Sequence, residues 1–280
     1  MSVFDGKYLN TNSKGFRGKN NYSYEKTHNK TRILVLGDPF TFGDNVSDHE
    51  TYSHQLQLRL PMTEIINLGV HGYGHDQMLI LLKEEGLKHK PDIIILGFIQ
   101  ADMRRNLLNF RDYAKPKFSL HDGRLKLTNS PVPAPEDTLD RDWIRPRIIG
   151  IFSIARHVYK QKTGLMETEM LSLTAALLNE IVNLAESIDA KPVFVYLPTH
   201  DEISTNEALT VGEQFMFDLC RQNNRLSCFS TRQKFAEKLA EGASFKTDGH
   251  WDAPGHQAVA EAIKVFLLDE ENQFLTRISN

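Results

Sequence analysis

The feature that most constrains the fold is a set of short apolar runs that alternate with helical segments in the first hundred residues. Residues 32–36 (RILVL), 65–68 (IINL) and 93–98 (IIILGF) are rich in leucine and β-branched side chains. Such runs are typical of strands that are buried on both faces. Residues 51–60 and 77–87 lie between them and carry apolar side chains at helical spacing. Strands that alternate with helices in this way predict a parallel sheet covered by helices on both sides.

The alternation is interrupted after residue 102 and then resumes. Residues 118–127 alternate around Asp122-Gly123, which is a hairpin turn signal, and a proline-rich stretch and a helical stretch follow. We interpret residues 103–164 as an inserted lid of a hairpin and helices over the strand ends. Residues 1–30 are polar and are expected to wrap the surface. The whole chain, residues 1–280, is predicted to form a single domain.

The composition is that of an ordinary globular protein and excludes several classes. The 280 residues are 40% hydrophobic and 25% charged, with a net charge of −3. These values argue against a disordered chain, a collagen-like repeat and an integral membrane protein. No basic stripe favours nucleic acid, and no apolar run has the length of a signal peptide or a membrane span. We therefore expect a cytoplasmic protein with a small-molecule substrate and no contact with nucleic acid or membrane, whose oligomeric state the sequence leaves open.

The chain contains only two cysteines, Cys220 and Cys228. Two cysteines cannot make a disulfide framework or a multi-cysteine zinc site. We expect them to be free thiols of a reducing compartment, although residues this near in the sequence could pair.

Four blocks of the sequence occur in an order that is specific when they are taken together. They are residues 37–43 (GDPFTFG), 67–74 (NLGVHGYG), 97–102 (GFIQAD) and 248–251 (DGHW). In this order they resemble the SGNH (GDSL-type) family of esterases and acyltransferases, and residues 12–18 (NSKGFRG) resemble the lead-in of a bacterial branch of it. The resemblance implies a three-layer α/β/α sandwich with a parallel, flavodoxin-like sheet.

The resemblance also implies roles for individual positions. In that family the first block supplies a nucleophilic serine directly after the aspartate, and the fourth supplies a histidine base with its aspartate. The glycine of the second block and an asparagine of the third form the oxyanion hole. The chain retains Gly72, Asp248 and His250 at these positions, but it has Pro39 for the serine and Ala101 for the asparagine. Proline has no hydroxyl and alanine no donor, so the usual serine acyl-enzyme route is not available.

Several side chains in these blocks are candidates for the remaining chemistry. Asp248 and His250 are predicted to act as orienting carboxylate and base, and Asp38 to take over part of the lost serine function. Gly72, His71, His75 and Asp102 are predicted to bind substrate or an oxyanion. Five of them also have a structural interpretation: Asp38 and Asp102 as carboxylates that hold a turn, His75 as a helix-start residue, and Asp248 with His250 as a pair that fixes the last loop.

Four functional hypotheses follow from these residues. The leading one is a diverged enzyme that acts on a small, acyl or glycan-derived molecule through a His–Asp base without a serine, by hydrolysis, elimination or cyclisation. The second is an inactive relative that binds a ligand or scaffolds a partner, and the third is a conventional esterase whose serine has been replaced. The fourth is a metal-dependent enzyme in which His71, His75 and His250 hold zinc or non-haem iron, because imidazole suits both metals.

Overall fold

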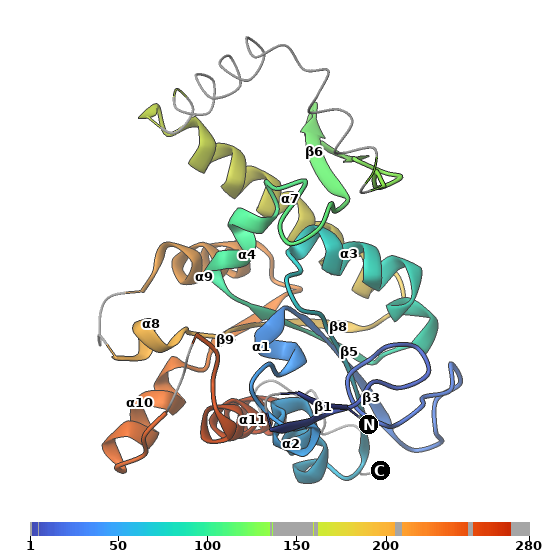
Figure 1. The fold of residues 1–280 in the computed structure, drawn as a ribbon, viewed down its shortest axis with the longest axis vertical. Helices are drawn as coiled ribbons and strands as arrows, with labels where there is room; N and C mark the ends of the chain where they lie inside the picture. The colour runs from blue at the N-terminus through green and yellow to red at the C-terminus, as the bar shows by residue number, and fades with distance from the viewer. Residues whose placement is uncertain are drawn as a thin grey trace.

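A five-stranded parallel sheet forms the centre of the protein (Figure 1). The structure is a computed structural model, which describes residues 2–4, 6–134, 136, 159, 162–204, 209–245 and 249–269. The strand order is β4-β3-β5-β8-β9. The strands are β3 (Thr31–Gly37), β4 (Thr63–Gly69), β5 (Ile93–Phe98), β8 (Lys191–Tyr196) and β9 (Ser227–Ser230). The first strand of the sheet, β3, has neighbours on both sides, so the order reverses there, and in such sheets ligands bind beyond the carboxyl ends at that point.

Helices cover both faces of the sheet, which gives the predicted α/β/α sandwich (Figure 1). One face is covered by α3 (His75–Glu84), α7 (Leu165–Glu186) and α9 (Val211–Gln222). The other is covered by α2 (Tyr52–Arg59), α10 (Arg232–Ala240) and α11 (Ala253–Leu268). The shorter helices are α1 (Pro39–Phe42), η1 (Asp48–Glu50), η2 (Gly86–His89), α4 (Gln100–Arg105) and α8 (His200–Ser204).

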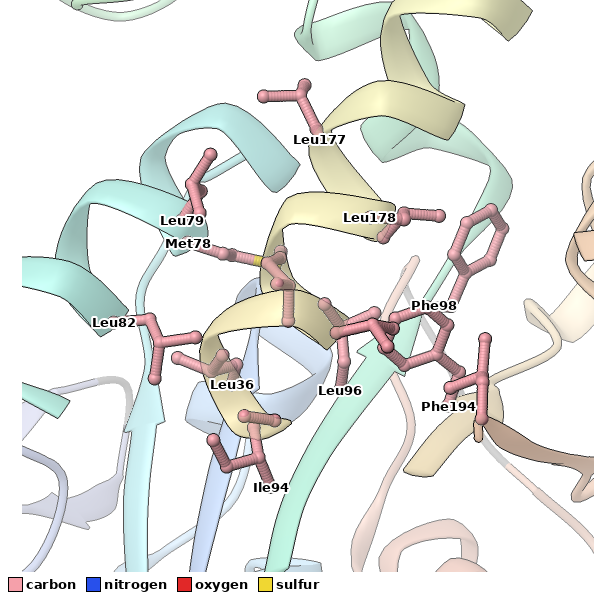
Figure 2. Close-up of a cluster of buried hydrophobic side chains, with 14 of the residues drawn as sticks. Leu36, Met78, Leu79, Leu82, Ile94, Leu96, Phe98, Leu177, Leu178 and Phe194 are labelled. Carbon is pink, nitrogen blue, oxygen red and sulfur yellow. The ribbon is translucent and has the colours of Figure 1, made fainter. Parts of the chain in front are cut away.

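The central residues of β3, β5 and β8 are apolar because each of the two faces of the sheet packs on a helical layer. In β3, Leu34 and Leu36 belong to the core under α3 and α7, whereas Ile33 and Val35 belong to the core under α2 and α11. Figure 2 shows the first of these clusters, where leucines of α3 and α7 close over the side chains of β3 and β5. Full burial of one such leucine or isoleucine contributes about 1.5–3 kcal/mol, so the two layers fix the register of the sheet.

The segment predicted as an insertion, residues 103–164, contains the hairpin that its turn signal predicts. Strands β6 (Lys117–His121) and β7 (Arg124–Thr128) pair in antiparallel fashion around Asp122 and Gly123. Both turn residues have positive φ, 50° and 75°, as a two-residue turn of this kind requires. The hairpin contacts α3 and α7. The predicted helical part of the insertion lies outside the described residues.

The polar N-terminal segment begins with a small ribbon and then crosses the outer strand of the sheet. Strands β1 (Ser2–Phe4) and β2 (Lys7–Leu9) pair with each other. Farther along, the Tyr22 hydroxyl donates to the carbonyl of Ile65 in β4 at 2.9 Å, and Lys14 pairs with Glu85 at 2.5 Å.

The expectation of free thiols is wrong, because Cys220 and Cys228 form a disulfide. Helix α9 ends at Gln222 and the chain returns at once to β9, which brings the two Cα atoms to 6.1 Å. This separation lies within the range that a disulfide spans.

Within the described ranges, no helix combines the length and apolar character needed to cross a membrane.

Candidate functional site

The first block of the sequence lies at the carboxyl end of β3, where the chain turns directly into α1. Asp38 caps α1, and its Oδ1 accepts the backbone N–H of Phe40 at 3.0 Å. Pro39 occupies the first position of the helix, which suits proline because that N–H has no helical partner. Pro39 is buried, so the position of the expected nucleophile is filled by a ring without a hydroxyl.

Two glycines at the strand ends allow α1 to lie close to the sheet. A Cβ on Gly69 would overlap the backbone of residues 41 and 42, and a Cβ on Gly97 would lie 2.6 Å from Oγ1 of Thr41. These approaches explain why glycines follow the apolar runs, and they place Thr41 and Phe42 of α1 against the ends of β4 and β5.

One arginine joins two buried carboxyl groups at this edge. Nη1 of Arg105, in α4, donates to Oδ2 of Asp38 at 2.8 Å and to Oδ1 of Asp102, and also to the carbonyl of Tyr73 at 3.1 Å. Asp38 and Asp102 are fully buried, whereas the Arg105 side chain is 13% exposed. Oδ2 of Asp102 is buried without a hydrogen-bond partner. The sequence predicted Asp38 and Asp102 at this edge but not their common partner.

Burial dominates the electrostatics of both acids. It raises the pKa of Asp102 well above its usual range, and the negative charge of Asp38 raises it further, against the opposing effect of Arg105. Burial also raises the pKa of Asp38, although Arg105, the N–H of Phe40 and the charge of His250 act in the opposite direction. The site therefore favours one negative charge, not two, beside the single guanidinium.

His250 lies beside the first turn of α1. Its partly exposed ring packs on that of Phe40 with the ring centres 5.0 Å apart. The next residue, Trp251, anchors this segment. Its ring packs on that of Phe40 with the ring centres 4.8 Å apart, and its Nε1 donates to the carbonyl of Pro198 at 3.0 Å. His250 has no hydrogen-bond partner among the described residues, and its predicted partner, Asp248, lies outside them.

Gly72, the glycine expected in the oxyanion hole, lies next to the guanidinium of Arg111. Gly72 has φ +77°, and a Cβ there would lie 2.6 Å from Nη1 of Arg111. Arg111 pairs with Asp112 at 2.5 Å. Ala101 is exposed in the first turn of α4 and offers no side-chain donor. The sequence contains no local signal that would place Arg111 against Gly72, because the contact depends on the path of the insertion.

The structure separates the two histidines of the second block. Nδ1 of His71 lies 2.6 Å from Oδ2 of Asp44, and the His71 side chain is exposed. His75 is fully buried against Phe98, and its Nδ1 accepts the Asn106 amide at 3.1 Å. Burial lowers the pKa of His75 to about 3, and the charge of Arg105 lowers it too, so this ring is neutral. His75 is a residue of the core behind the site and has no path to a substrate.

The predicted metal site is not formed by the residues proposed for it. Within the described parts of the chain, no three histidine, cysteine, aspartate or glutamate side chains are arranged to hold a metal ion. The reason is geometric, since His75 points into the core toward Asn106 and His71 toward Asp44.

A second buried ion pair supports the site from the insertion side. Nζ of Lys115 contacts Asp76 at the start of α3, and it donates to the carbonyls of Arg105 and Leu108 at 3.2 Å each. Both side chains of the pair are at most 2% exposed. Lys115 therefore ties the insertion to the end of the helix that carries Arg105.

A cavity of about 400 Å³ lies away from these residues, between the N-terminal segment, α2 and β4. Tyr8, Arg17, Ser53, His54 and Asn67 are among the residues that line it. None of Asp38, Arg105 and His250 does, so the cavity is separate from the cluster at the strand ends.

Comparisons with known proteins agree on the fold. No family model matches the chain, and no curated protein matches it. Among solved structures, the acetyl xylan esterase AlAXEase is 11% identical, covering 83% of this chain and 98% of its own, with a TM-score of 0.50. A putative lipolytic protein of the G-D-S-L family from Desulfitobacterium hafniense DCB-2 is 13% identical, with 84% and 98% covered and a TM-score of 0.46. A G-D-S-L family member from Veillonella parvula DSM 2008 is 12% identical, with 85% and 100% covered and a TM-score of 0.49. The strand order, the two helical layers and the likeness to the acetyl xylan esterase together show that the chain has the α/β sandwich fold of the SGNH (GDSL-type) hydrolases.

Proposed function

We propose that the chain is a diverged esterase-like enzyme that hydrolyses an acyl ester on a small, glycan-derived molecule without a serine nucleophile. The observation that carries the proposal is a buried proline at the nucleophile position, followed by Phe40, on which the partly exposed ring of His250 packs. In this proposal His250 transfers protons and water takes the place of the serine hydroxyl.

The hydroxyl of Thr41, two residues after Pro39, is not placed to take over the attack. Thr41 is fully buried in α1, and its Oγ1 shares a hydrogen bond with the hydroxyl of Tyr52 at 2.8 Å. A nucleophile needs both access to the substrate and a base within hydrogen-bond reach, and Thr41 has no access. Attack by water requires neither a covalent intermediate nor a side-chain hydroxyl.

Two arginines offer hydrogen-bond donors and positive charge in place of the asparagine that the family uses for the oxyanion. Nε and Nη2 of Arg105 have no hydrogen-bond partner among the described residues, and Arg111 lies against Gly72. Loss of one oxyanion donor typically costs about 10²–10³-fold in rate. A guanidinium beside the Gly72 backbone is suited to offset that loss, because charged donors form stronger hydrogen bonds than neutral ones.

The loop around Arg111 supports the choice of substrate class. Phe110 and Tyr113 are 56% and 49% exposed, and a bridge between Phe110 and Ala114 closes the loop. Exposed aromatic side chains offer a flat apolar surface to a sugar ring or an acyl chain. One solved structure that is similar in fold is described as an acetyl xylan esterase, which is consistent with an acylated glycan as substrate.

The proposal is tested with 4-nitrophenyl acetate and with an acetylated xylo-oligosaccharide as probes. We expect slow hydrolysis by the wild-type protein and a fall of about 10²–10⁴-fold in the His250→Ala variant, because general acid–base catalysis contributes that much. His28→Ala, which changes an exposed histidine of the N-terminal segment, is the matched control. Equal rates for His250→Ala and the control would remove His250 from the reaction.

A second candidate function is ligand binding without turnover. The observation in its favour is that both serine and asparagine positions lack their side-chain groups while Arg105 and Arg111 remain beside the strand ends. This function predicts that acetylated xylo-oligosaccharides bind to the protein and that their acetyl groups are still present after prolonged incubation. Calorimetry combined with chromatography of the recovered oligosaccharide separates the two functions.

A further inference from the structure

We propose that Asp44 and His71 form a second proton-transfer pair of the site, in which Nε2 of His71 accepts the proton of the attacking water and Arg17 holds Asp44 in place. The inference rests on the proposed function, because it names a further catalytic residue for the same reaction. The sequence identified His71 as a candidate but gave it no partner.

The hydrogen bond between the two side chains determines which nitrogen of His71 is free. Oδ2 of Asp44 lies 2.6 Å from Nδ1 of His71. An ionised carboxylate can only accept, so the Nδ1 proton belongs to this bond and Nε2 of the neutral ring carries a lone pair. The His71 side chain is 55% exposed, and Nε2 has no partner in the described part of the chain. A neutral ring held in this way is a proton acceptor that faces solvent.

The backbone around Asp44 has a shape that fixes the direction of its carboxylate. Gly43 has φ 89° and Asn45 has φ 68°, so left-handed residues flank Asp44 on both sides. The N–H groups of Gly43 and Asp44 both donate to the carbonyl of Pro39, at 2.8 and 3.1 Å. Asp44 is therefore tied to the residue that stands at the nucleophile position.

Arg17 clamps the same turn from the N-terminal segment. Its side chain is 1% exposed and donates to the carbonyl of Gly43 at 3.2 Å and to that of Val46 at 2.8 Å. Its Nε also pairs with Oδ1 of Asp48 at 2.9 Å. These bonds hold the backbone before and after Asp44, so we assign Arg17 and Asp44 as positioning residues.

The loop that carries His71 is anchored at the site. The N–H of Val70 donates to the carbonyl of Gly37 at 3.1 Å, which fixes the loop to the end of β3. His71 directly precedes Gly72, against which Arg111 packs. In this proposal the attacking water binds beside Gly72, the residue next to His71, and the guanidinium of Arg111 at Gly72 faces the oxygen that becomes negative.

The step balances as an ordinary ester hydrolysis. The water oxygen bonds to the acyl carbon while its proton passes to Nε2 of His71, and the bond from that carbon to the alcohol oxygen then breaks. The leaving alkoxide takes a proton from the imidazolium of His250. The products are a carboxylic acid and an alcohol, and proton exchange with solvent restores both histidines.

The variant that tests the pair is Asp44→Asn, which preserves the shape of the side chain and reverses its hydrogen bonding. An amide can donate to Nδ1, so the ring proton moves to Nε2 and the lone pair is lost there. Nitrogen NMR of ¹⁵N-histidine-labelled protein should show the Nδ1–H form of neutral His71 in the wild type and a shift toward Nε2–H in the variant. With 4-nitrophenyl acetate as probe, we expect Asp44→Asn and His71→Gln each to be about 10²-fold slower or more. The control is Asp218→Asn, which removes a carboxylate on α9 that also has an ion-pair partner. It should leave the His71 spectrum and the hydrolysis rate unchanged.

The outcomes separate this inference from the proposed function. A wild-type spectrum in which neutral His71 carries its proton on Nε2 overturns the pair. Unchanged rates in Asp44→Asn and His71→Gln, together with a loss in His250→Ala, overturn the pair and leave the proposed function in place. A loss in Asp44→Asn with no loss in His250→Ala supports the pair and removes the role of His250. Absence of turnover by the wild-type protein on both probes overturns the two proposals together.

Discussion

Asp38 and Asp102 both accept hydrogen bonds from the same nitrogen of Arg105, and neither carboxyl group reaches solvent. Two buried acids that share one cation cannot both be ionised without an uncompensated charge. The pKa of each is raised by burial, and that of Asp102 also by the charge of Asp38. The contribution of this cluster to the free energy of unfolding should therefore fall as pH rises.

The substitution Asp102→Asn should stabilise the protein at neutral pH. The amide still accepts from Arg105 but removes the surplus negative charge, so we expect a gain on the order of 1 kcal/mol. A carboxyl group whose pKa is higher in the folded than in the unfolded chain binds more protons when folded, so its contribution to stability falls as pH rises from about 3.9 upward. The advantage of Asp102→Asn over wild type should accordingly grow with rising pH and disappear in acid.

Urea denaturation at a series of pH values measures this difference directly. Asp122→Asn, at the exposed turn of the hairpin where a positive φ suits asparagine, is the control and should give a flat difference. If the difference between Asp102→Asn and wild type were instead to shrink as pH rises, the assignment of Asp102 as a destabilised buried acid would be incorrect.

Removal of Arg105 should have the opposite effect. Arg105→Met leaves both carboxyl groups without a counter-charge, and breaking such a buried pair costs about 3–5 kcal/mol. Addition of Asp38→Asn and Asp102→Asn to the same chain should restore part of the loss, because the carboxyl groups that need the cation are then gone. Arg104→Met, at the exposed neighbouring position, is the control. If the effects of the three single substitutions simply add up in the triple variant, the three side chains do not act as a unit.

The sheet could be predicted from the sequence because local apolar runs identify its strands. The runs at β3, β4 and β5 are apolar on both faces, and the turn at Asp122-Gly123 marks the hairpin by its own chemistry. Helix α10 was not predicted, since its polar sequence presents only Phe235 as a buried residue.

The site was predicted only where it depends on strand ends. Asp38 and Gly72 follow strands and therefore had to lie at the same edge of the sheet. The side-chain pairs at this edge join residues 27 and 67 positions apart, as in Asp44 with His71 and Asp38 with Arg105. Such pairs depend on the paths of loops, which no periodic pattern encodes. For the same reason His75 looked like a site residue, although the turn before α3 directs it into the core.

The disulfide between Cys220 and Cys228 should contribute measurably to stability. It closes a short loop between α9 and β9, with a sequence separation of 8. A loop of that size reduces the entropy of the unfolded chain by an amount worth about 2.5 kcal/mol. The double substitution Cys220→Ser and Cys228→Ser should lower the free energy of unfolding by about that amount. Dithiothreitol should lower the Tm of wild type and leave that of the variant unchanged, and thiol titration of the unfolded wild type should find thiols only after reduction.

Restoration of the missing side-chain groups tests whether the strand ends have the geometry of an esterase site. Pro39→Ser places a hydroxyl at the start of α1, beside His250, and Ala101→Asn adds a donor at the exposed start of α4. We expect Pro39→Ser alone to gain little, and the double variant to be about 10²–10³-fold faster on 4-nitrophenyl acetate, because an oxyanion donor contributes that much. An acyl-enzyme should then appear as a burst of 4-nitrophenol, which water attack in the wild type does not produce. The matched control is Pro39→Ala with Ala101→Asn, which has the donor but no hydroxyl. Equal rates and no burst in the two double variants would mean that residue 39 and His250 are not within reach of each other, and the histidine beside the proline would then have no part in attack at that position.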